Sequence, residues 1–241
     1  MMNILITNDD GIYAPGIDAL VRWARHLGNV TVVAPKVEQS GKSHSIEFTK
    51  PVEIRPVDLW DGVTAYAMDS TPADCVRFGI CGLEKTYDLV LSGINRGVNL
   101  GADLVYSGTV AAVFEAGRLD HRALALSTYP TTLREATAEL DRVWQFLSEN
   151  ALLEKNPLYN VNIPKEPQGL RITRQGSTYF SDVFEEVEKN MYLQTGKQID
   201  DVCPHDETLD TVMTEKGYIT LTPLLTTRTN LAVFESLKEL R

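Results

Sequence analysis

The amino-acid sequence predicts an α/β fold, a mostly parallel β-sheet with helices on both faces. From the start of the chain to about residue 150, short apolar runs typical of buried strands alternate with stretches of helical periodicity. Such alternation is typical of parallel strands joined by helices that cover the sheet. With 43% hydrophobic and 23% charged residues, the composition also suits a globular protein with a sizeable core.

Each expected strand is a short apolar run bounded by turn-forming or charged residues. In chain order, the strands are residues 4–7, 30–34, 52–56, 64–67, 87–91, 123–127, 159–163 and 217–222. The third and fourth runs are less apolar, so we expect them to be more exposed. Pro164 stops the strand before it, because proline has no backbone N–H to donate.

Helical periodicity predicts five helices, at 14–27, from 72 onward, and at 109–119, 133–150 and 228–240. In the first, Pro15 suits the opening turn and Gly28 suits the end. In the second, Thr71 is the expected cap and Asp74 lies near the positive helix end. The helix at 133–150 is expected to be continuous, because apolar residues recur along one face. Residues 169–205 show only short alternating pieces.

Charge and cysteine content exclude several classes of protein. The formal net charge is −10 and no lysine or arginine block occurs, so no nucleic acid polymer is expected as a partner. No apolar stretch approaches 18 residues and no signal peptide is recognisable, so we expect a cytoplasmic protein without a membrane partner. The cysteines Cys75, Cys81 and Cys203 do not form a disulfide or zinc pattern, and the first two are expected to be buried.

Polar residues follow three of the predicted strands. The first strand ends in Asn8-Asp9-Asp10, the second leads into a polar loop with Ser40, and the strand at 87–91 leads into a segment with Asn95. Ligand sites of open α/β sheets lie beyond the carboxyl ends of their strands. Carboxylate, hydroxyl and amide oxygens suit Mg²⁺ or Mn²⁺. The sequence therefore predicts a divalent metal site at this edge.

The segment Ser107-Gly108-Thr109 opens a predicted helix and is a candidate phosphate site. Free N–H groups and the positive helix end attract phosphate, and Gly108 permits close approach. An ordinary helix cap is the alternative for this segment taken alone. The glycine-rich stretch before it, with Asn95 and Asn99, favours a polar cradle. Because neither a P-loop nor a dinucleotide motif occurs, metal-assisted phosphoryl chemistry is the favoured interpretation.

Two further residues have open alternatives. His44 is a candidate general acid, because histidine titrates near neutral pH, but a structural hydrogen bond to the loop explains it equally well. Arg96 is a candidate contact for phosphate or nucleobase, with a solvated loop charge as the alternative. A Mg²⁺-binding receiver-like protein and a nucleotide-binding regulator without turnover remain rival functions.

Segments along nearly the whole chain together resemble the SurE family, the survival protein E nucleotidases. The most specific segments are ILITNDDGIYAPG at 4–16, VVAPKVEQSGKSHSI at 32–46, STPADCV at 70–76 and SGINRGVNLGADLVYSGTVAA at 92–112. Weaker matches are NVNIP at 160–164, RITRQ at 171–175 and GYITLTPL at 217–224. The combination is specific, whereas NDDG alone would be weak.

The resemblance implies a metal-dependent 5'-nucleotidase that hydrolyses nucleoside 5'- and 3'-monophosphates, with short polyphosphate as a further candidate substrate. Carried over to this chain, one Mg²⁺ or Mn²⁺ per subunit would be held by Asp9, Asp10, Ser40 and Asn95. The catalytic residues would be Asp9 and Asp10. The phosphate contacts would be Asn99, Ser107, Gly108 and Thr109.

The resemblance also implies an organisation of the chain. Residues 1–164 would form a Rossmann-like catalytic core. Residues 165–241 would form a C-terminal extension with a β-hairpin and a terminal helix, partly packed on the core. Exchange of these elements between subunits would give a homodimer or homotetramer.

Overall fold

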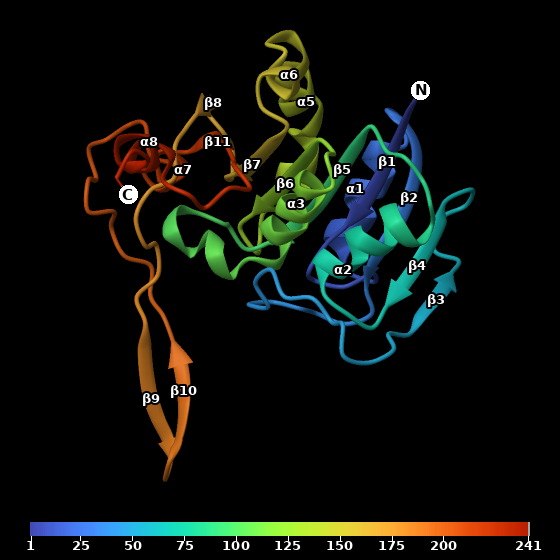
Figure 1. Ribbon diagram of the computed structural model, residues 1–241, viewed down its shortest axis with the longest axis horizontal. Coiled ribbons are helices and arrows are strands. Elements are labelled where there is room, and N and C mark those ends of the chain that lie inside the picture. The colour runs from blue at the N-terminus through green and yellow to red at the C-terminus, as the bar shows by residue number, and fades with distance from the viewer. Residues whose placement is uncertain (241) are drawn as a thin grey trace.

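A nine-stranded β-sheet forms the centre of the computed structural model, with strand order β3-β4-β2-β1-β5-β6-β7-β11-β8 (Figure 1). The structure describes residues 1–240; Arg241, the last residue of the predicted extension, lies outside the described part. The strands of this sheet are β1 Met2–Thr7, β2 Gly28–Pro35, β3 Ile54–Val57, β4 Thr64–Met68, β5 Leu89–Arg96, β6 Ala123–Thr128, β7 Leu158–Ile163, β8 Gly169–Ile172 and β11 Tyr218–Pro223. Strands β4, β2, β1, β5, β6 and β7 pair in parallel, whereas β3 and β11 run antiparallel to β4 and β7.

The helices lie on both faces of this sheet, which confirms the predicted fold class. They are α1 Pro15–Ala24, α2 Pro72–Arg77, α3 Gly108–Arg118, α4 Leu133–Ala138, α5 Leu140–Glu149, α6 Leu152–Lys155, α7 Asp210–Glu215 and α8 Leu231–Leu237, with the wide turn η1 Phe78–Gly82 and the 3₁₀ turn η2 Gly101–Tyr106. One apolar core packs α1, α4 and α5 against the sheet. A second core packs α2 and α3 against the other face.

Alternation of side chains along the strands explains the two cores. In β1, Ile4 and Ile6 belong to the core under α1, while Leu5 belongs to the core under α2 and α3. Successive side chains of a strand point to opposite faces, so a strand covered on both faces is apolar at every position. This is why the first strand appears in the sequence as a continuous apolar run.

Two predicted helices and one glycine differ from expectation. The predicted helix at 133–150 is interrupted at Glu139 and forms α4 and α5. The first helix ends at Ala24, and Gly28 begins β2 instead of ending the helix. A Cβ atom at Gly28 would lie 2.0 Å from the backbone oxygen of Met2. Close approach of β1 and β2 therefore accounts for this glycine.

The expected burial of one cysteine is wrong. Cys75 is buried in α2, as predicted, but Cys81 is exposed. The wide turn η1 follows α2 directly and changes the helical phase, so the periodicity of α2 does not extend to residue 81.

The strand predicted at 87–91 extends in the structure to Arg96. Its pairing with β6 shifts between Ser92 and Asn95. The two residues between them interrupt the ladder, which is typical of a bulge that redirects the end of a strand. Asn95 thereby lies at the same edge of the sheet as the residues that follow β1.

The C-terminal part adds β8 and β11 to the sheet and then departs from it. Strands β9 Val183–Glu188 and β10 Met191–Thr195 form an antiparallel hairpin, here called the arm, which projects away from the body (Figure 1). No side chain of α8 is buried. None of the helices formed by residues 1–240 has the length and apolar character needed to cross a bilayer.

Candidate functional site

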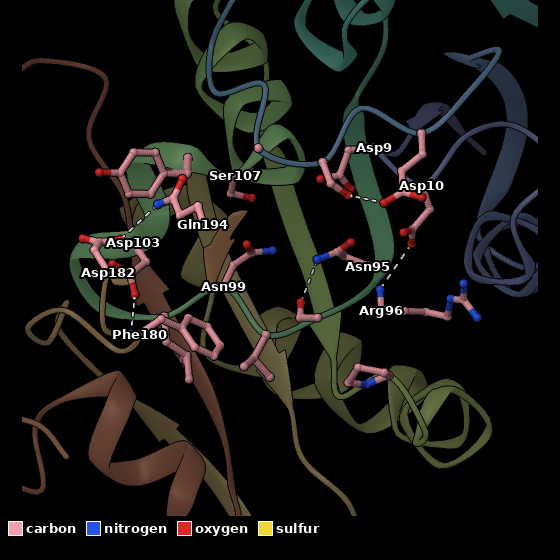
Figure 2. A pocket seen from close by; sticks show the side chains of 18 of the residues that line it. Asp9, Asp10, Asn95, Arg96, Asn99, Asp103, Ser107, Phe180, Asp182 and Gln194 are labelled. Atoms are coloured by element: carbon pink, nitrogen blue, oxygen red, sulfur yellow. Dashed lines mark hydrogen bonds between the residues drawn. The ribbon is translucent and has the colours of Figure 1, made fainter. Parts of the chain in front are cut away.

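A cavity of about 860 Å³ lies at the carboxyl ends of β1 and β5. It is lined by most of the residues predicted for the site, namely Asp9, Asp10, Ser40, Asn95, Asn99 and Ser107. Figure 2 shows Asp9, Asp10 and Asn95 together on one side of the cavity, with Asn99 and Ser107 farther along it. The fold therefore brings three separate loops to one cavity.

Asp9 is the most constrained residue of the site. It is 4% exposed, and its carboxylate accepts hydrogen bonds from the hydroxyl and the backbone N–H of Thr109. Burial raises the pKa of Asp9 to about 6; the Thr109 hydroxyl bond opposes that rise, and the charge of Asp10 adds to it. The ionised carboxylate of Asp9 is therefore costly without a cation nearby.

Gly108 and Thr109 lie behind Asp9 and do not line the cavity. A Cβ atom at Gly108 would lie 3.0 Å from the Cβ of Asp9, so the absence of a side chain lets α3 approach this acid. Ser107 caps α3, because its hydroxyl accepts a hydrogen bond from the N–H of Val110 at 3.1 Å. The positive end of α3 therefore faces Asp9 and the cavity together.

Asp10 is held by the end of β5. Its carboxylate accepts the backbone N–H of Arg96 at 3.2 Å. Burial raises the pKa of Asp10, while the backbone bond and the charge of Arg96 oppose the rise. The side chain of Arg96 itself is exposed and points away from Asp9 in Figure 2. Its position beside Asp10 places it away from Ser107, the residue predicted to contact phosphate.

The donor set fits a hard divalent cation. The amide nitrogen of Asn95 donates to the backbone oxygen of Gly97 at 2.7 Å, which leaves the side-chain oxygen for another partner. The loop with Ser40 is joined to Asp9 by a backbone bond of 2.7 Å from Gln39 to the Asp9 oxygen. Residues 1–240 contain no metal-binding cluster made of three or more His, Cys, Asp or Glu side chains, so the candidate site is one of two carboxylates with hydroxyl and amide oxygens. Oxygen donors of mixed type, as here, suit Mg²⁺ or Mn²⁺ better than Zn²⁺.

Asn99 is held by buried residues that were not predicted from the sequence. Its backbone N–H donates to the side-chain oxygen of Asn162, and its backbone oxygen accepts the amide groups of Asn160 and Asn162, each at 2.8 Å. Its own amide nitrogen donates to the Ser127 hydroxyl at 2.8 Å. The signal in the sequence is the pair of asparagines two residues apart in a buried strand, which places both on one face.

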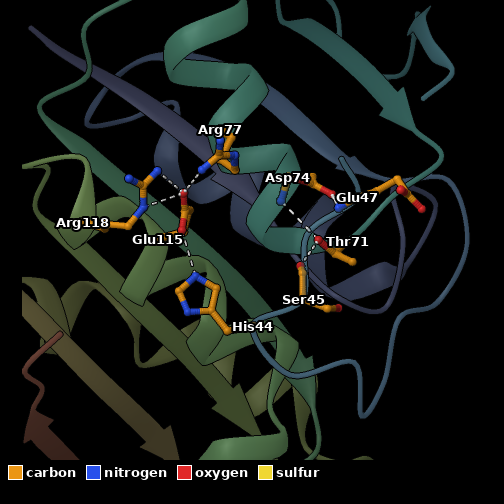
Figure 3. Close-up of polar contacts among 8 residues, drawn as sticks. All are labelled: His44, Ser45, Glu47, Thr71, Asp74, Arg77, Glu115 and Arg118. Carbon is orange, nitrogen blue, oxygen red and sulfur yellow. Dashed lines mark hydrogen bonds and ion pairs between the residues drawn. The ribbon is translucent and has the colours of Figure 1, made fainter. Parts of the chain in front are cut away.

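His44 lies outside the lining of this cavity. Its Nε2 atom is 2.9 Å from a carboxylate oxygen of Glu115 in α3 (Figure 3). This is a structural position, but its partner is a carboxylate of α3 and not the loop backbone that was expected. Arg77 and Arg118 donate to the other oxygen of the same carboxylate at 3.0 and 2.7 Å. Burial by itself raises the pKa of Glu115, but the bonds from His44, Arg118 and Arg77 outweigh it and hold the pKa at about 2.

Two sets of contacts fix the loop that carries Ser40. One is the bond between His44 and Glu115. The other is made by Ser43, whose N–H and hydroxyl donate to the backbone oxygens of Tyr106 and Val105 at 3.1 and 2.6 Å. The loop is thereby tied to α3 and to the turn that precedes it. Both ends of the predicted site, the metal ligands and the helix N-terminus, share this support.

We expect Asn162→Ala to lower the free energy of unfolding by about 2 kcal/mol, because it leaves the backbone N–H of Asn99 without a partner, while the backbone oxygen of Asn99 keeps the amide of Asn160. Urea unfolding checks this value. Asn150→Ala is the control, because Asn150 is exposed and bonds only to Phe146 of its own helix. Equal effects of the two substitutions would contradict a special role for Asn162.

We expect Glu115→Gln to remove an acid-dependent part of the stability. The folded pKa of Glu115 lies below its ordinary 4.5, so the carboxylate stabilises the fold fully above about pH 4.5, and this contribution is lost as the pH falls toward 2. The difference in the free energy of unfolding between wild type and variant should be constant from pH 7 to about 5 and should shrink as the pH falls to 3. Glu154→Gln, at an exposed ion pair, is the control with a small effect at every pH. If the free energies of unfolding of wild type and Glu115→Gln differed by the same amount at every pH, the lowered pKa of Glu115 would be refuted.

Comparison with known proteins identifies the family. The family described as survival protein SurE matches residues 4–182. A relative named 5'-nucleotidase SurE from Caldanaerobacter subterraneus subsp. tengcongensis is 38% identical over 255 residues, covering 99% of this chain and 96% of the relative. One of the same name from Clostridium botulinum (strain Alaska E43) is 39% identical, with 100% and 98% covered. The crystal structure of a SurE protein from Aquifex aeolicus superposes with a TM-score of 0.81 at 35% identity, with 99% of both chains covered. This chain therefore belongs to the SurE family.

Proposed function

We propose that this chain is a phosphomonoesterase that requires a divalent metal and hydrolyses nucleoside 5'- and 3'-monophosphates to nucleoside and phosphate. The observation that carries the proposal is the pair Asp9 and Asp10, one of them almost fully buried, at the positive end of α3 in a cavity of suitable size. Relatives that match over nearly the full chain are named 5'-nucleotidases, which supports this choice of substrate.

We propose that Asp9, Asp10, Ser40 and Asn95 hold one Mg²⁺ or Mn²⁺ per subunit. When bound, such a cation acts as a Lewis acid on a phosphoryl oxygen and lowers the pKa of water. Its charge also offsets the repulsion between the two adjacent carboxylates. The burial of Asp9, and the presence of carboxylate, hydroxyl and amide oxygens around one cavity, support this assignment.

The remaining predicted residues bind and orient the phosphate. Asn99 and Ser107 line the cavity and contact the phosphate oxygens directly in this proposal. Gly108 and Thr109 let the positive end of α3 lie against the site, where it stabilises negative charge that develops on the phosphoryl group. Asp9, fixed by Thr109, orients the attacking water.

We expect Asp9→Asn and Asp10→Asn each to lower the rate of phosphate release from AMP by at least about 10²-fold. Chelation of divalent ions should abolish the wild-type rate, and added Mn²⁺ should restore it. Asp61→Asn, at an exposed acid away from the cavity, is the control with a normal rate. Near-normal rates in both site variants would refute the proposed chemistry.

The same assay separates the enzyme from a regulator without turnover. A regulator would bind AMP, detected by calorimetry, but would release no phosphate with either Mg²⁺ or Mn²⁺. No feature of the cavity favours that alternative.

We propose that residues 1–164 form the catalytic part and that residues 165–241 supply subunit contacts in a homodimer or homotetramer. Apolar side chains at the surface of the arm and α8, outside the cavity lining, support this, among them Val187, Leu193 and Phe234, which are 62%, 55% and 52% exposed. Light scattering tests the assembly, and a monomer would contradict it.

We also propose a cytoplasmic location, which is supported by a cysteine content too low for a disulfide framework.

A further inference from the structure

The cavity extends well beyond the residues assigned to metal and phosphate. Its opposite end is formed by the arm and by the segment that leads into it, through Phe180, Asp182, Phe184 and Gln194. In Figure 2, Phe180, Asp182 and Gln194 lie across the cavity from Asp9 and Asp10, with Asn99 and Ser107 between the two groups. A phosphate held near Ser107 therefore leaves the rest of its ester facing the arm.

Three exposed aromatic side chains line the cavity, and two of them, Phe180 and Phe184, belong to this opposite end. Tyr106, Phe180 and Phe184 are 59%, 43% and 64% exposed. Exposed aromatic rings grouped at a cavity gain free energy when a flat apolar group covers them. A nucleobase is such a group, because each of its faces can stack on an aromatic ring.

Phe180 is fixed in place by backbone contacts. The carboxylate of Asp103, in η2, accepts the N–H groups of Tyr179 and Phe180, each at 2.9 Å. The buried Tyr179 ring packs edge-on against Phe180 with ring centroids 4.9 Å apart. The hydroxyl of Tyr179 bonds to Glu215 of α7. The base of the arm is thus anchored on the body of the protein. The Phe180 ring therefore faces the cavity before a ligand binds, and ligand binding does not have to order this segment.

The charges at this end disfavour a second anionic group. Asp103 and Asp182 both line it, and Asp182 accepts the amide of Gln194 at 3.3 Å. Among the residues that line the cavity, Arg96 carries the positive charge, and it lies beside Asp10 at the other end. The carboxylates here would repel an additional phosphate, whereas they would accept hydrogen bonds from a neutral group that has donors.

We propose that the base of the arm is a nucleoside-binding wall, on which Phe180 stacks the base of a nucleoside monophosphate while Asp182 and Gln194 face its polar edge. This inference rests on the proposed function and assigns its substrate selectivity. It explains how a site built around metal and phosphate selects a nucleoside ester over a simple sugar phosphate.

The test compares AMP with ribose 5-phosphate, which has the same phosphate and sugar but no base. In Phe180→Ala, we expect kcat/KM for AMP to fall roughly 10- to 100-fold, the range of one base–aromatic stack, with kcat/KM for ribose 5-phosphate unchanged within about twofold. Phe180→Tyr should keep the preference for AMP. Phe48→Ala is the control, because Phe48 is an exposed aromatic residue outside the cavity lining.

Equal losses on both substrates, or no loss on AMP, would overturn the nucleoside-binding wall. A second measurement uses the wild-type protein alone and does not depend on how a variant folds. Adenosine should bind at least about tenfold more tightly than ribose by calorimetry, and equal affinities would also overturn the inference. Absence of phosphate release from both esters would refute the proposed function instead, while adenosine binding would still decide whether the wall exists.

Discussion

Burial of two neighbouring carboxylates is the constraint on which the site depends. Asp9 and Asp10 directly follow β1, and burial raises the pKa of both. A carboxylate loses hydration when it is buried, and a second one beside it adds repulsion. Thr109 and the backbone of Arg96 offset part of this cost with hydrogen bonds. The remainder makes the position favourable for a divalent cation.

The rest of the fold holds the partners of this pair in place. The missing side chain at Gly108 lets α3 lie against Asp9, while the asparagines of β7 hold Asn99 in the same cavity. Glu115 binds the loop with Ser40 to α3 through His44. These contacts anchor loop residues of the site on β7 and α3, which favours the preorganised donors that selective ion binding and electrostatic stabilisation require.

Local patterns in the sequence were sufficient for the sheet and for much of the site. Apolar runs predicted the parallel strands, and polar residues after them predicted which side chains meet, because the carboxyl ends of parallel strands share an edge. The break at Glu139 and the exposure of Cys81 were missed, since periodicity does not register a change of helical phase. A local pattern places Asn160 and Asn162 on one face of a strand, but their contacts with Asn99, like the wall around Phe180, join residues some 60 or more positions apart, and no local pattern encodes those partners.

The most direct measurement is the binding of Mn²⁺ to the chelator-treated protein by calorimetry, with the fold of each variant checked by circular dichroism. We predict one Mn²⁺ per chain in the wild type and no measurable binding in folded Asp9→Asn or Asp10→Asn. Unchanged affinity and stoichiometry in both variants would contradict a cation site at the end of β1.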